Sequence, residues 1–224
     1  MSVLVQSLPH LLRGAVSTLA LAAAVLAVGT ALGLAVGLLR VLPGRAGTVV
    51  GGAVELVRAV PLLLLLFFIF FGLPALGVRI PTFPAAVLAM SLWMAANTAE
   101  VVRGGVQSIS RGQFEAARSL GLGWASTMRF VILPQATRRM VPPFVGLCTI
   151  LVKDTSLAAI IGVFELTRAA QETIERTFRS FELYLVVAGM YFVICFTLTS
   201  LSRALERRLG SPGRIVLAGP AAAE

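Results

Sequence analysis

The sequence predicts an all-α membrane protein with five transmembrane helices. Hydrophobic residues make up 58% of the 224-residue chain and charged residues only 13%, which is far from the composition of soluble domains. The apolar residues gather in runs long enough for helices that cross a bilayer. The predicted spans are residues 15–39, 49–71, 85–109, 140–164 and 183–202.

The predicted spans and the loops between them form one transmembrane domain, residues 15–208, with a short segment before it and a tail after it. Residues 1–14 precede the first span and are expected outside the membrane. A polar loop of about residues 110–136 separates the third and fourth spans. The tail, residues 209–224, is rich in Pro, Gly and Ala, and this composition predicts disorder.

The first span is predicted to be retained rather than cleaved. Residues 15–39 carry no charge over 25 positions and are followed by Arg40, whereas a signal peptide has a shorter apolar core and a small-residue cleavage site. Gly29, Gly33 and Gly37 recur at every fourth position. They predict a smooth helix face that another helix can approach closely.

Charged residues inside the second and third spans occur in pairs of opposite sign. Glu55 and Arg58 are three residues apart, as are Glu100 and Arg103. This spacing places both members on one face of a helix, so each pair is expected to form an ion pair that offsets part of the cost of burial in lipid. Pro61 follows Arg58 by one turn within the predicted second span.

Several polar residues within the spans are candidates for lining a transport pathway. Charges at membrane depth are costly unless they face a partner or water, and the amide of an asparagine there also needs a hydrogen-bond partner. The charged candidates also have an interpretation without a transport role. Glu100 can be part of an ion pair near the membrane face, and Lys153 and Asp154 can be an interfacial charge pair that extends outward to the membrane surface. The candidates are Asn97, Glu100, Lys153, Asp154, Thr155 and Ser156.

The polar loop is predicted to fold as two helices joined by a glycine turn. Gly112 is expected to cap the first, short helix. Gly121 suits the left-handed residue that closes it. A second helix is expected to begin near Trp124, and Pro134 is expected to stop or kink it. The turn between the helices is predicted to be exposed.

The same loop resembles the EAA loop of ABC-transporter permeases of bacterial importers. The resemblance rests on Glu115-Ala116-Ala117, on Gly121 and on Ile132-Leu133-Pro134. Four further segments resemble the polar amino acid uptake branch of these permeases: VRAVPLLLLLFFIFFGLP, EVVRGGVQSISRGQFEAARSLG, VILPQATRRMVPP and LVKDTSL. The resemblance covers about residues 8–208. It implies the type I ABC importer permease fold, in which the short helix of the loop is a cytoplasmic coupling helix. The implied coupling residues are Glu115, Ala116, Ala117 and Gly121.

The resemblance also implies partners and a substrate class. The coupling helix would dock on a separate ATP-hydrolysing subunit, a second copy or a paralogous permease would complete the pathway, and an extracytoplasmic binding protein would deliver a polar amino acid. The KDTSL element resembles one on the helix that lines the pathway. Val60 stands where the family usually has threonine, and Asn97 where many members have an aromatic residue. Gly146 and Leu147 supply no carboxylate or amide, which favours glutamine or glutamate over arginine or lysine.

The arginines orient the predicted spans. With the N-terminus outside, twelve arginines fall in the inner segments and five in the outer ones. The positive-inside rule therefore predicts a multi-pass protein of the bacterial cytoplasmic membrane, with the C-terminus and the loop of residues 110–136 in the cytoplasm.

The sequence gives no support to catalysis. It contains no G-x-x-x-x-G-K-[ST] phosphate loop, no metal constellation and no nucleophile beside a base, so we expect no cofactor and ATP hydrolysis by a separate subunit. No aromatic and basic surface indicates nucleic acid. Two alternatives belong to other classes: an ion-coupled secondary transporter, disfavoured because no internal repeat is visible, and a non-transporting scaffold. A permease for another small solute is a third.

Overall fold

The computed structural model describes residues 2–208, which contain helices and no strand. The α-helices are α1 Ser2–Arg40, α2 Arg45–Ala59, α3 Leu62–Phe67, α4 Leu73–Ala75, α5 Thr82–Gln107, α6 Arg111–Ser119, α7 Trp124–Thr127, α8 Leu133–Asp154, α9 Leu166–Thr177 and α10 Ser180–Arg208. Two π turns, η1 Phe68–Gly72 and η2 Met128–Ile132, and one 3-10 helix, η3 Thr155–Ile161, connect some of them. The predicted all-α fold class is confirmed. The predicted tail, residues 209–224, lies outside the described residues.

Within residues 2–208, four helical segments are long and apolar enough to cross a membrane. They are Gln6–Arg40, Thr82–Gln107, Trp124–Ile161 and Ser180–Ser200. The bent pair formed by α2 and the α3–α4 segment is a fifth candidate if it is counted as one span. Residues 2–14, which were expected to form a separate external segment, continue the same helix as the first span.

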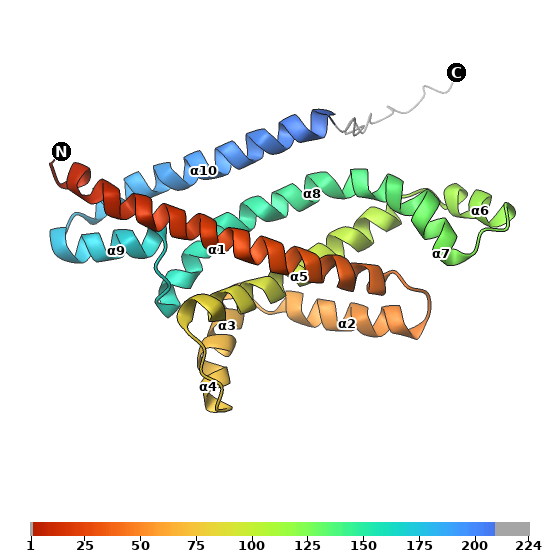
Figure 1. Ribbon diagram of the computed structural model, residues 1–224, viewed down its shortest axis with the longest axis horizontal. Helices are drawn as coiled ribbons and strands as arrows, with labels where there is room; N and C mark the ends of the chain where they lie inside the picture. Colours follow the sequence, from red (N-terminus) through yellow and green to blue (C-terminus); the bar gives the residue numbers. More distant parts are fainter. Residues whose placement is uncertain (1, 209–224) are drawn as a thin grey trace, which may run out of the picture.

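The predicted second span, residues 49–71, is not one continuous helix. It breaks at Val60 and Pro61, and the helical segments on either side meet at 94°. Proline lacks the N–H that an α-helix needs, and it pushes the residue before it toward extended backbone. Val60 accordingly has φ −87° and ψ 126°. The α3–α4 segment projects from the bundle (Figure 1).

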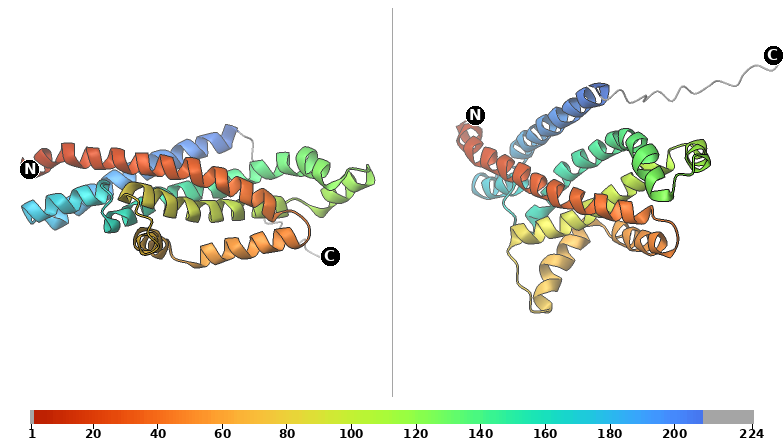
Figure 2. Two further views of the ribbon diagram at one scale, coloured as in Figure 1. Left: turned by 60° about the horizontal axis from the view of Figure 1, so that its bottom comes forward. Right: turned by 45° about the vertical axis from the view of Figure 1, so that its right-hand side comes forward.

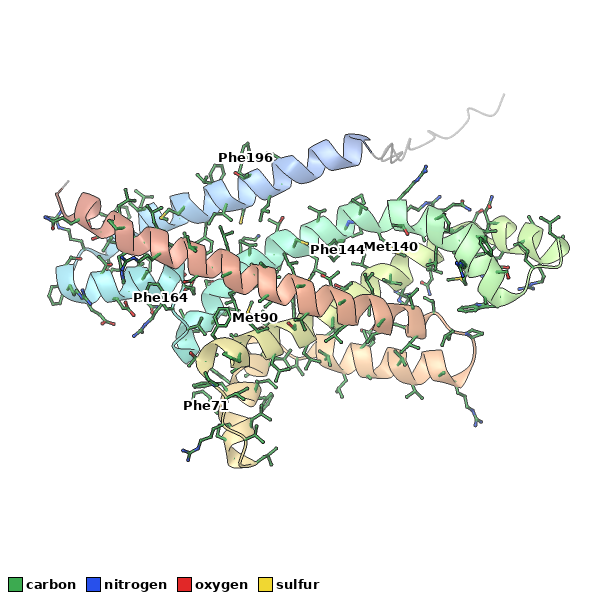
Figure 3. All side chains as sticks on the ribbon, in the orientation of Figure 1. Phe71, Met90, Met140, Phe144, Phe164 and Phe196 are labelled. Carbon is green, nitrogen blue, oxygen red and sulfur yellow. The ribbon has the colours of Figure 1, made fainter. Side chains whose placement is uncertain are left out.

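The helix α5 lies at the centre of the bundle, with α1 along its length (Figure 1). Met90 of α5 is fully buried, whereas Phe196 of α10 is 56% exposed (Figure 3). Only 11% of the residues in the apolar window of α10 are buried, and this helix lies apart from most of the bundle (Figure 2). The exposed apolar side chains are those expected of a chain whose solvent is partly lipid.

The glycine face of α1 allows the close approach to α5. A Cβ atom added at Gly33 would lie 2.5 Å from the Cβ of Thr98 and 2.7 Å from the carbonyl oxygen of Ala95. Added Cβ atoms at Gly29 and Gly37 would lie 2.7 Å from side-chain atoms of α5. The predicted smooth face is therefore confirmed.

The connection after η3 is more buried than the sequence indicated. The mixture of acidic and basic residues in 165–182 is typical of an exposed helical connection, but Glu165 is fully buried at the start of α9. Its carboxylate accepts hydrogen bonds from Arg168 N at 2.7 Å and from the Tyr191 hydroxyl at 2.7 Å. Thr18 Oγ1 also donates to it at 3.5 Å. Glu165 thus joins α1, α9 and α10, and burial raises the pKa of its carboxyl group.

Candidate functional site

The segment from Ser110 to Trp124 forms an exposed elbow at one end of the bundle (Figure 1). Gly121 has φ 74°, in the left-handed region. Gly121 N donates to Arg118 O at 2.9 Å, and Leu122 N donates to Ala117 O at 3.1 Å. This pair of bonds is the Schellman motif. The predicted left-handed closure at Gly121 is confirmed.

The start of this helix was predicted wrongly. The N-cap is Ser110 in extended backbone, and α6 begins at Arg111 rather than after Gly112. The Ser110 side chain makes no capping hydrogen bond, but Gln113 N donates to Ser110 O at 3.1 Å. The sequence favoured Gly112 because glycine is also accepted at N-caps; serine is the more common choice.

The exposed side of the elbow carries three of the four predicted coupling residues, Glu115, Ala116 and Gly121. Glu115 and Ala116 are exposed, and Leu120 at the tip is 80% exposed. Among the described residues the carboxylate of Glu115 has no ion pair within 4.0 Å. Ala117 is buried, and Phe114 packs against the small core that includes Ile132. One side of α6 therefore anchors the elbow, and the opposite side is free for a partner.

The elbow is joined to the long helix α8 through a π turn. As predicted, a helix begins at Trp124. Pro134, however, does not end the helical path: η2 precedes it, and α8 continues to Asp154. A π turn adjusts the hydrogen-bond ladder where proline supplies no N–H. Gln135 Nε2 donates to Gln113 Oε1 at 3.2 Å and to Val131 O at 2.7 Å, which links α6 to α8 directly.

The charged residues of α2 and α5 form one network. Both predicted pairs are present: Arg58 lies 3.1 Å from Glu55, and Arg103 contacts Glu100. Arg40 at the end of α1 joins them, with Nη2 2.7 Å from Glu55 Oε1 and Nη1 3.0 Å from Glu100 Oε2. We call these five residues the charge network. Arg40 was not predicted as a member because it follows the first span and only the hairpin between α1 and α2 returns it to Glu55.

The polar residues of the third span share one half-exposed face of α5. Trp93, Asn97 and Glu100 are partly exposed, and Gly104 is exposed. Asn97 Nδ2 donates to Trp93 O at 2.9 Å, so its amide finds a partner on its own helix.

The KDTS residues lie elsewhere. Lys153 is exposed and Asp154 is partly exposed, and among the described residues no ion pair within 4.0 Å joins them. Thr155 is buried and donates to Val152 O at 2.7 Å. Ser156 donates to Lys153 O at 2.8 Å.

Among the described residues no hydrogen bond or ion pair joins Asn97 to the KDTS residues: the polar side chains of Asn97, Thr155 and Ser156 each donate to a backbone oxygen of their own helical segment.

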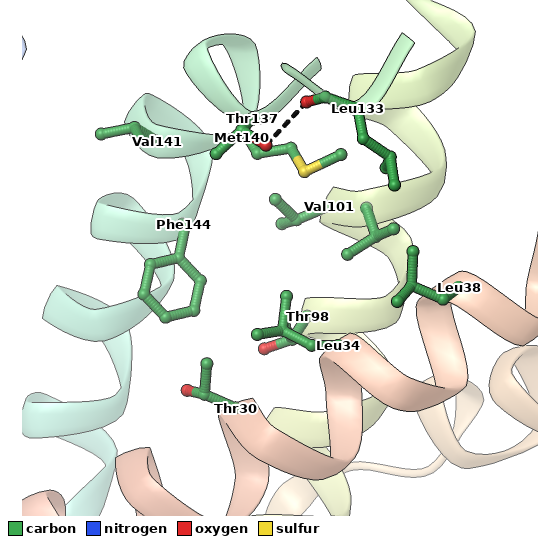
Figure 4. Close-up of a pocket in the computed structure, with 11 residues that line it drawn as sticks. Thr30, Leu34, Leu38, Thr98, Val101, Leu133, Thr137, Met140, Val141 and Phe144 are labelled. Carbon is green, nitrogen blue, oxygen red and sulfur yellow. Dashed lines mark hydrogen bonds between the residues drawn. The ribbon is translucent and has the colours of Figure 1, made fainter. Parts of the chain in front are cut away.

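A separate cavity of about 370 Å³ lies between α1, α5 and α8 (Figure 4). It is lined mainly by apolar side chains such as Leu34 and Phe144, and it contains none of the predicted pathway residues. The hydroxyls of Thr30 and Thr98 border it, and both are buried without a hydrogen-bond partner.

Comparisons with known proteins agree with this architecture. The family described as "Binding-protein-dependent transport system inner membrane component" matches residues 29–211. The glutamine transport system permease protein GlnP of Escherichia coli (strain K12) is 41% identical over 206 residues, which cover 91% of this chain and 94% of that protein. The probable glutamine ABC transporter permease protein GlnP of Bacillus subtilis (strain 168) is 42% identical over 159 residues, covering 69% and 72%.

A solved structure has the same fold. It is the crystal structure of an amino acid ABC transporter with histidines, which superposes with a TM-score of 0.87 at 35% identity and covers 92% of this chain and 96% of that one. The family match spans most of the chain, and the last part of α1, the elbow and every later described helix lie within it. The chain therefore belongs to the family of binding-protein-dependent transport system inner membrane components.

Proposed function

We propose that this chain is the permease subunit of an ATP-driven importer that carries a glutamine-like amino acid by alternating access. The observation that carries the substrate class is the similarity to a glutamine transport permease over nearly the whole chain. Gly146 of α8 is exposed, and no side chain lies within 4 Å of the place of its missing Cβ. An open, neutral position there is consistent with a substrate that has no cationic side chain.

The elbow is the proposed docking site for a separate ATPase subunit. Glu115 and Ala116 present a free surface, while Ala117 and Gly121 hold the helix and its turn in place. The contact between Gln113 and Gln135 gives a direct route by which movement of α6 reaches α8. Closure of ATPase subunits would in this way move α8, which carries Lys153 and Asp154 and leads directly into Thr155 and Ser156 of η3.

The half-exposed polar faces support a second permease subunit. Asn97 and Glu100 on α5, and Lys153 on α8, would be costly to leave against lipid. A second copy or a paralogous chain would cover these faces and enclose water between the subunits. An external binding protein would deliver substrate to the opposite end of the bundle from the elbow, where α9 lies (Figure 1).

The arginine distribution supports an orientation with the elbow in the cytoplasm. Arg40 ends α1, Arg45 begins α2, Arg103 lies in the last turns of α5 and Arg111 begins α6. Figure 1 shows these helix ends at the end of the bundle that carries α6. The positive-inside rule assigns such an end to the cytoplasm, with the N-terminus outside. The ion-coupled alternative gains no support from a family whose name specifies dependence on a binding protein.

Uptake by the assembled transporter tests the proposal. The permease would be reconstituted in proteoliposomes with its candidate ATPase and binding protein, and uptake of radiolabelled glutamine would be measured with and without ATP. We expect uptake that requires ATP and all three components, and competition by unlabelled glutamine that exceeds competition by arginine or lysine. Uptake driven by an ion gradient without ATP, or a preference for a cationic amino acid, would contradict it.

A further inference from the structure

A second cavity lies at the elbow end of the bundle, on the side of the α1–α2 hairpin. Its volume is about 470 Å³, and it is bordered by the end of α1, the start of α2 and the end of α5. The polar side chains that line it are Arg40, Thr48, Arg103 and Gln107. No carboxylate is among the residues that line it.

Arg40 is the buried cation of this cavity. Its side chain is only 9% exposed, and Nη1 is buried without a hydrogen bond although it lies 3.0 Å from Glu100 Oε2. The charge network holds three guanidinium groups and two carboxylates, so one positive charge is left uncompensated. Arg40 and Arg103 line the cavity, whereas their carboxylate partners Glu55 and Glu100 do not.

The partial charges at the ends of the bordering helices do not make this cavity positive. The start of α2 has no side-chain cap, and its free N–H groups favour an anion. The ends of α1 and α5 border the same cavity with their carbonyl groups, whose partial negative charge opposes this effect. The two arginines therefore dominate. Gln107 Oε1 accepts a hydrogen bond from Arg103, which leaves the NH₂ group of Gln107 as a further donor.

The cavity lies where two apolar spans end. The candidate span Gln6–Arg40 ends at Arg40, and the candidate span Thr82–Gln107 ends at Gln107. Both terminal residues line the cavity. The ends of apolar spans mark the level at which lipid headgroups begin.

We propose that this cavity binds the phosphate of an anionic phospholipid headgroup. Guanidinium groups bind phosphate oxygens through paired, charge-assisted hydrogen bonds, and basic pockets between transmembrane helices at the cytoplasmic surface suit such headgroups. The volume admits a phosphoglycerol group. The inference is independent of which solute the permease carries.

Native mass spectrometry of the purified full-length chain in neutral detergent tests the site. The protein is mixed with equal amounts of phosphatidylglycerol and phosphatidylcholine, and the lipid that stays bound is identified. We expect preferential retention of phosphatidylglycerol. Arg103→Gln should lower this retention on the order of tenfold, because it removes a charged donor to phosphate. Arg118→Gln, on the exposed side of α6, removes the same charge away from the cavity and should retain the lipid.

A pair of glycine variants tests the same site without changing charge. Gly51 lines the cavity, and an added Cβ there would meet only Arg40 Nε at 3.6 Å. Gly51→Leu should therefore fold and fill the space, and retention of phosphatidylglycerol should again fall on the order of tenfold. Gly52 faces open space and does not line the cavity, so Gly52→Leu should retain the lipid.

A second arm replaces the lipid with inorganic phosphate at millimolar concentration. Displacement of phosphatidylglycerol by phosphate from the wild type supports a site for this anion. Retention of phosphate with no preference between the two lipids would overturn the assignment to a headgroup. Undiminished lipid retention in both Arg103→Gln and Gly51→Leu would overturn the site itself. Gel filtration of each variant as one symmetric peak shows that it is folded.

Discussion

The backbone N–H of Leu122 donates a hydrogen bond of 3.1 Å to the carbonyl oxygen of Ala117, across the turn made by Gly121. This bond closes α6 and fixes the direction in which the chain leaves it. The buried Ala117 and the exposed tip at Leu120 are thereby held in one rigid unit. The shape of the elbow thus depends on one glycine conformation, which a single substitution can test.

Gly121→Val should uncouple transport without preventing insertion. Gly121 has φ 74°, and an added Cβ would meet nothing within 4 Å. The cost is therefore conformational, on the order of 1–2 kcal/mol for a side chain in the left-handed region. We expect normal amounts of protein in the membrane, but weak association with the ATPase subunit or ATP hydrolysis that is not matched by uptake.

Gly123→Val is the matched control. Gly123 lies two residues away, also with open space at its Cβ position, but it has φ −67°, which valine adopts readily. Its uptake should stay close to wild type. Normal uptake and normally stimulated ATP hydrolysis in Gly121→Val would show that this elbow is not the coupling element.

Gly33→Ala should loosen the contact between α1 and α5. The added methyl would lie 2.5 Å from the Cβ of Thr98 and 2.7 Å from the backbone oxygen of Ala95, so one helix must shift. Overpacking of this kind costs about 1–3 kcal/mol. The midpoint of thermal unfolding in detergent should fall. Gly189→Ala, where the added Cβ meets nothing within 4 Å, should leave the midpoint unchanged, and equal midpoints for the two variants would contradict the proposed close packing.

The long apolar runs and the local turn at Gly121 could be predicted because each depends on nearby residues. Pro61 could be recognised in the sequence as a residue that interrupts helices, but the 94° bend between the helices on either side could not be predicted. Its direction is set by where α3 packs against α5, and no local pattern encodes that contact. Nor could local spacing show whether Asn97 and Lys153 meet, since their separation depends on the register between two helices.

The charge network gives a similar contrast. The pairs Glu55–Arg58 and Glu100–Arg103 follow from helical spacing, and both were predicted. Arg40 joins them only because the α1–α2 hairpin and the α1–α5 contact bring three helix positions together. The burial of Glu165 was missed for the same reason: its partners Thr18 and Tyr191 are 147 and 26 residues away.

Glu100→Gln should destabilise the structure more than removal of an isolated surface carboxylate. Glu100 lies 3.0 Å from Arg40 and 3.6 Å from Arg58, and it also contacts Arg103. Its loss would leave three guanidinium groups with one carboxylate. Because these side chains are partly exposed, we expect about 1–2 kcal/mol rather than the larger cost of a fully buried pair.

The comparison for that variant is Glu182→Gln. Glu182 is 47% exposed and lies 4.0 Å from its single partner, Arg179. Its removal should change stability by less than about 0.5 kcal/mol. Thermal unfolding of both variants in the same detergent measures the difference. If the two midpoints agree, the charge network does not hold α1, α2 and α5 together.

Glu165→Gln should change how stability depends on pH. The carboxyl of Glu165 is fully buried, and burial raises its pKa above the ordinary value of 4.5. The protonated form is therefore the one that the folded state favours. The resulting stabilisation is fully present below pH 4.5 and is lost as the pH rises through the raised pKa. Glutamine cannot ionise, yet its Oε1 can still accept the hydrogen bond from Arg168 N while its NH₂ group donates to the Tyr191 hydroxyl.

The measurement is the difference in unfolding midpoint between Glu165→Gln and wild type, followed upward from pH 4.5. We expect the variant to gain relative to wild type as the pH rises, because wild type must then bury a carboxylate. The other ionisable groups are common to both proteins, so their contributions cancel in the difference. Glu175→Gln, an exposed position on the same helix, should not show this gain. Parallel curves for Glu165→Gln and wild type would mean that Glu165 titrates as an ordinary carboxyl group, and that its burial does not make the joint between α1, α9 and α10 sensitive to pH.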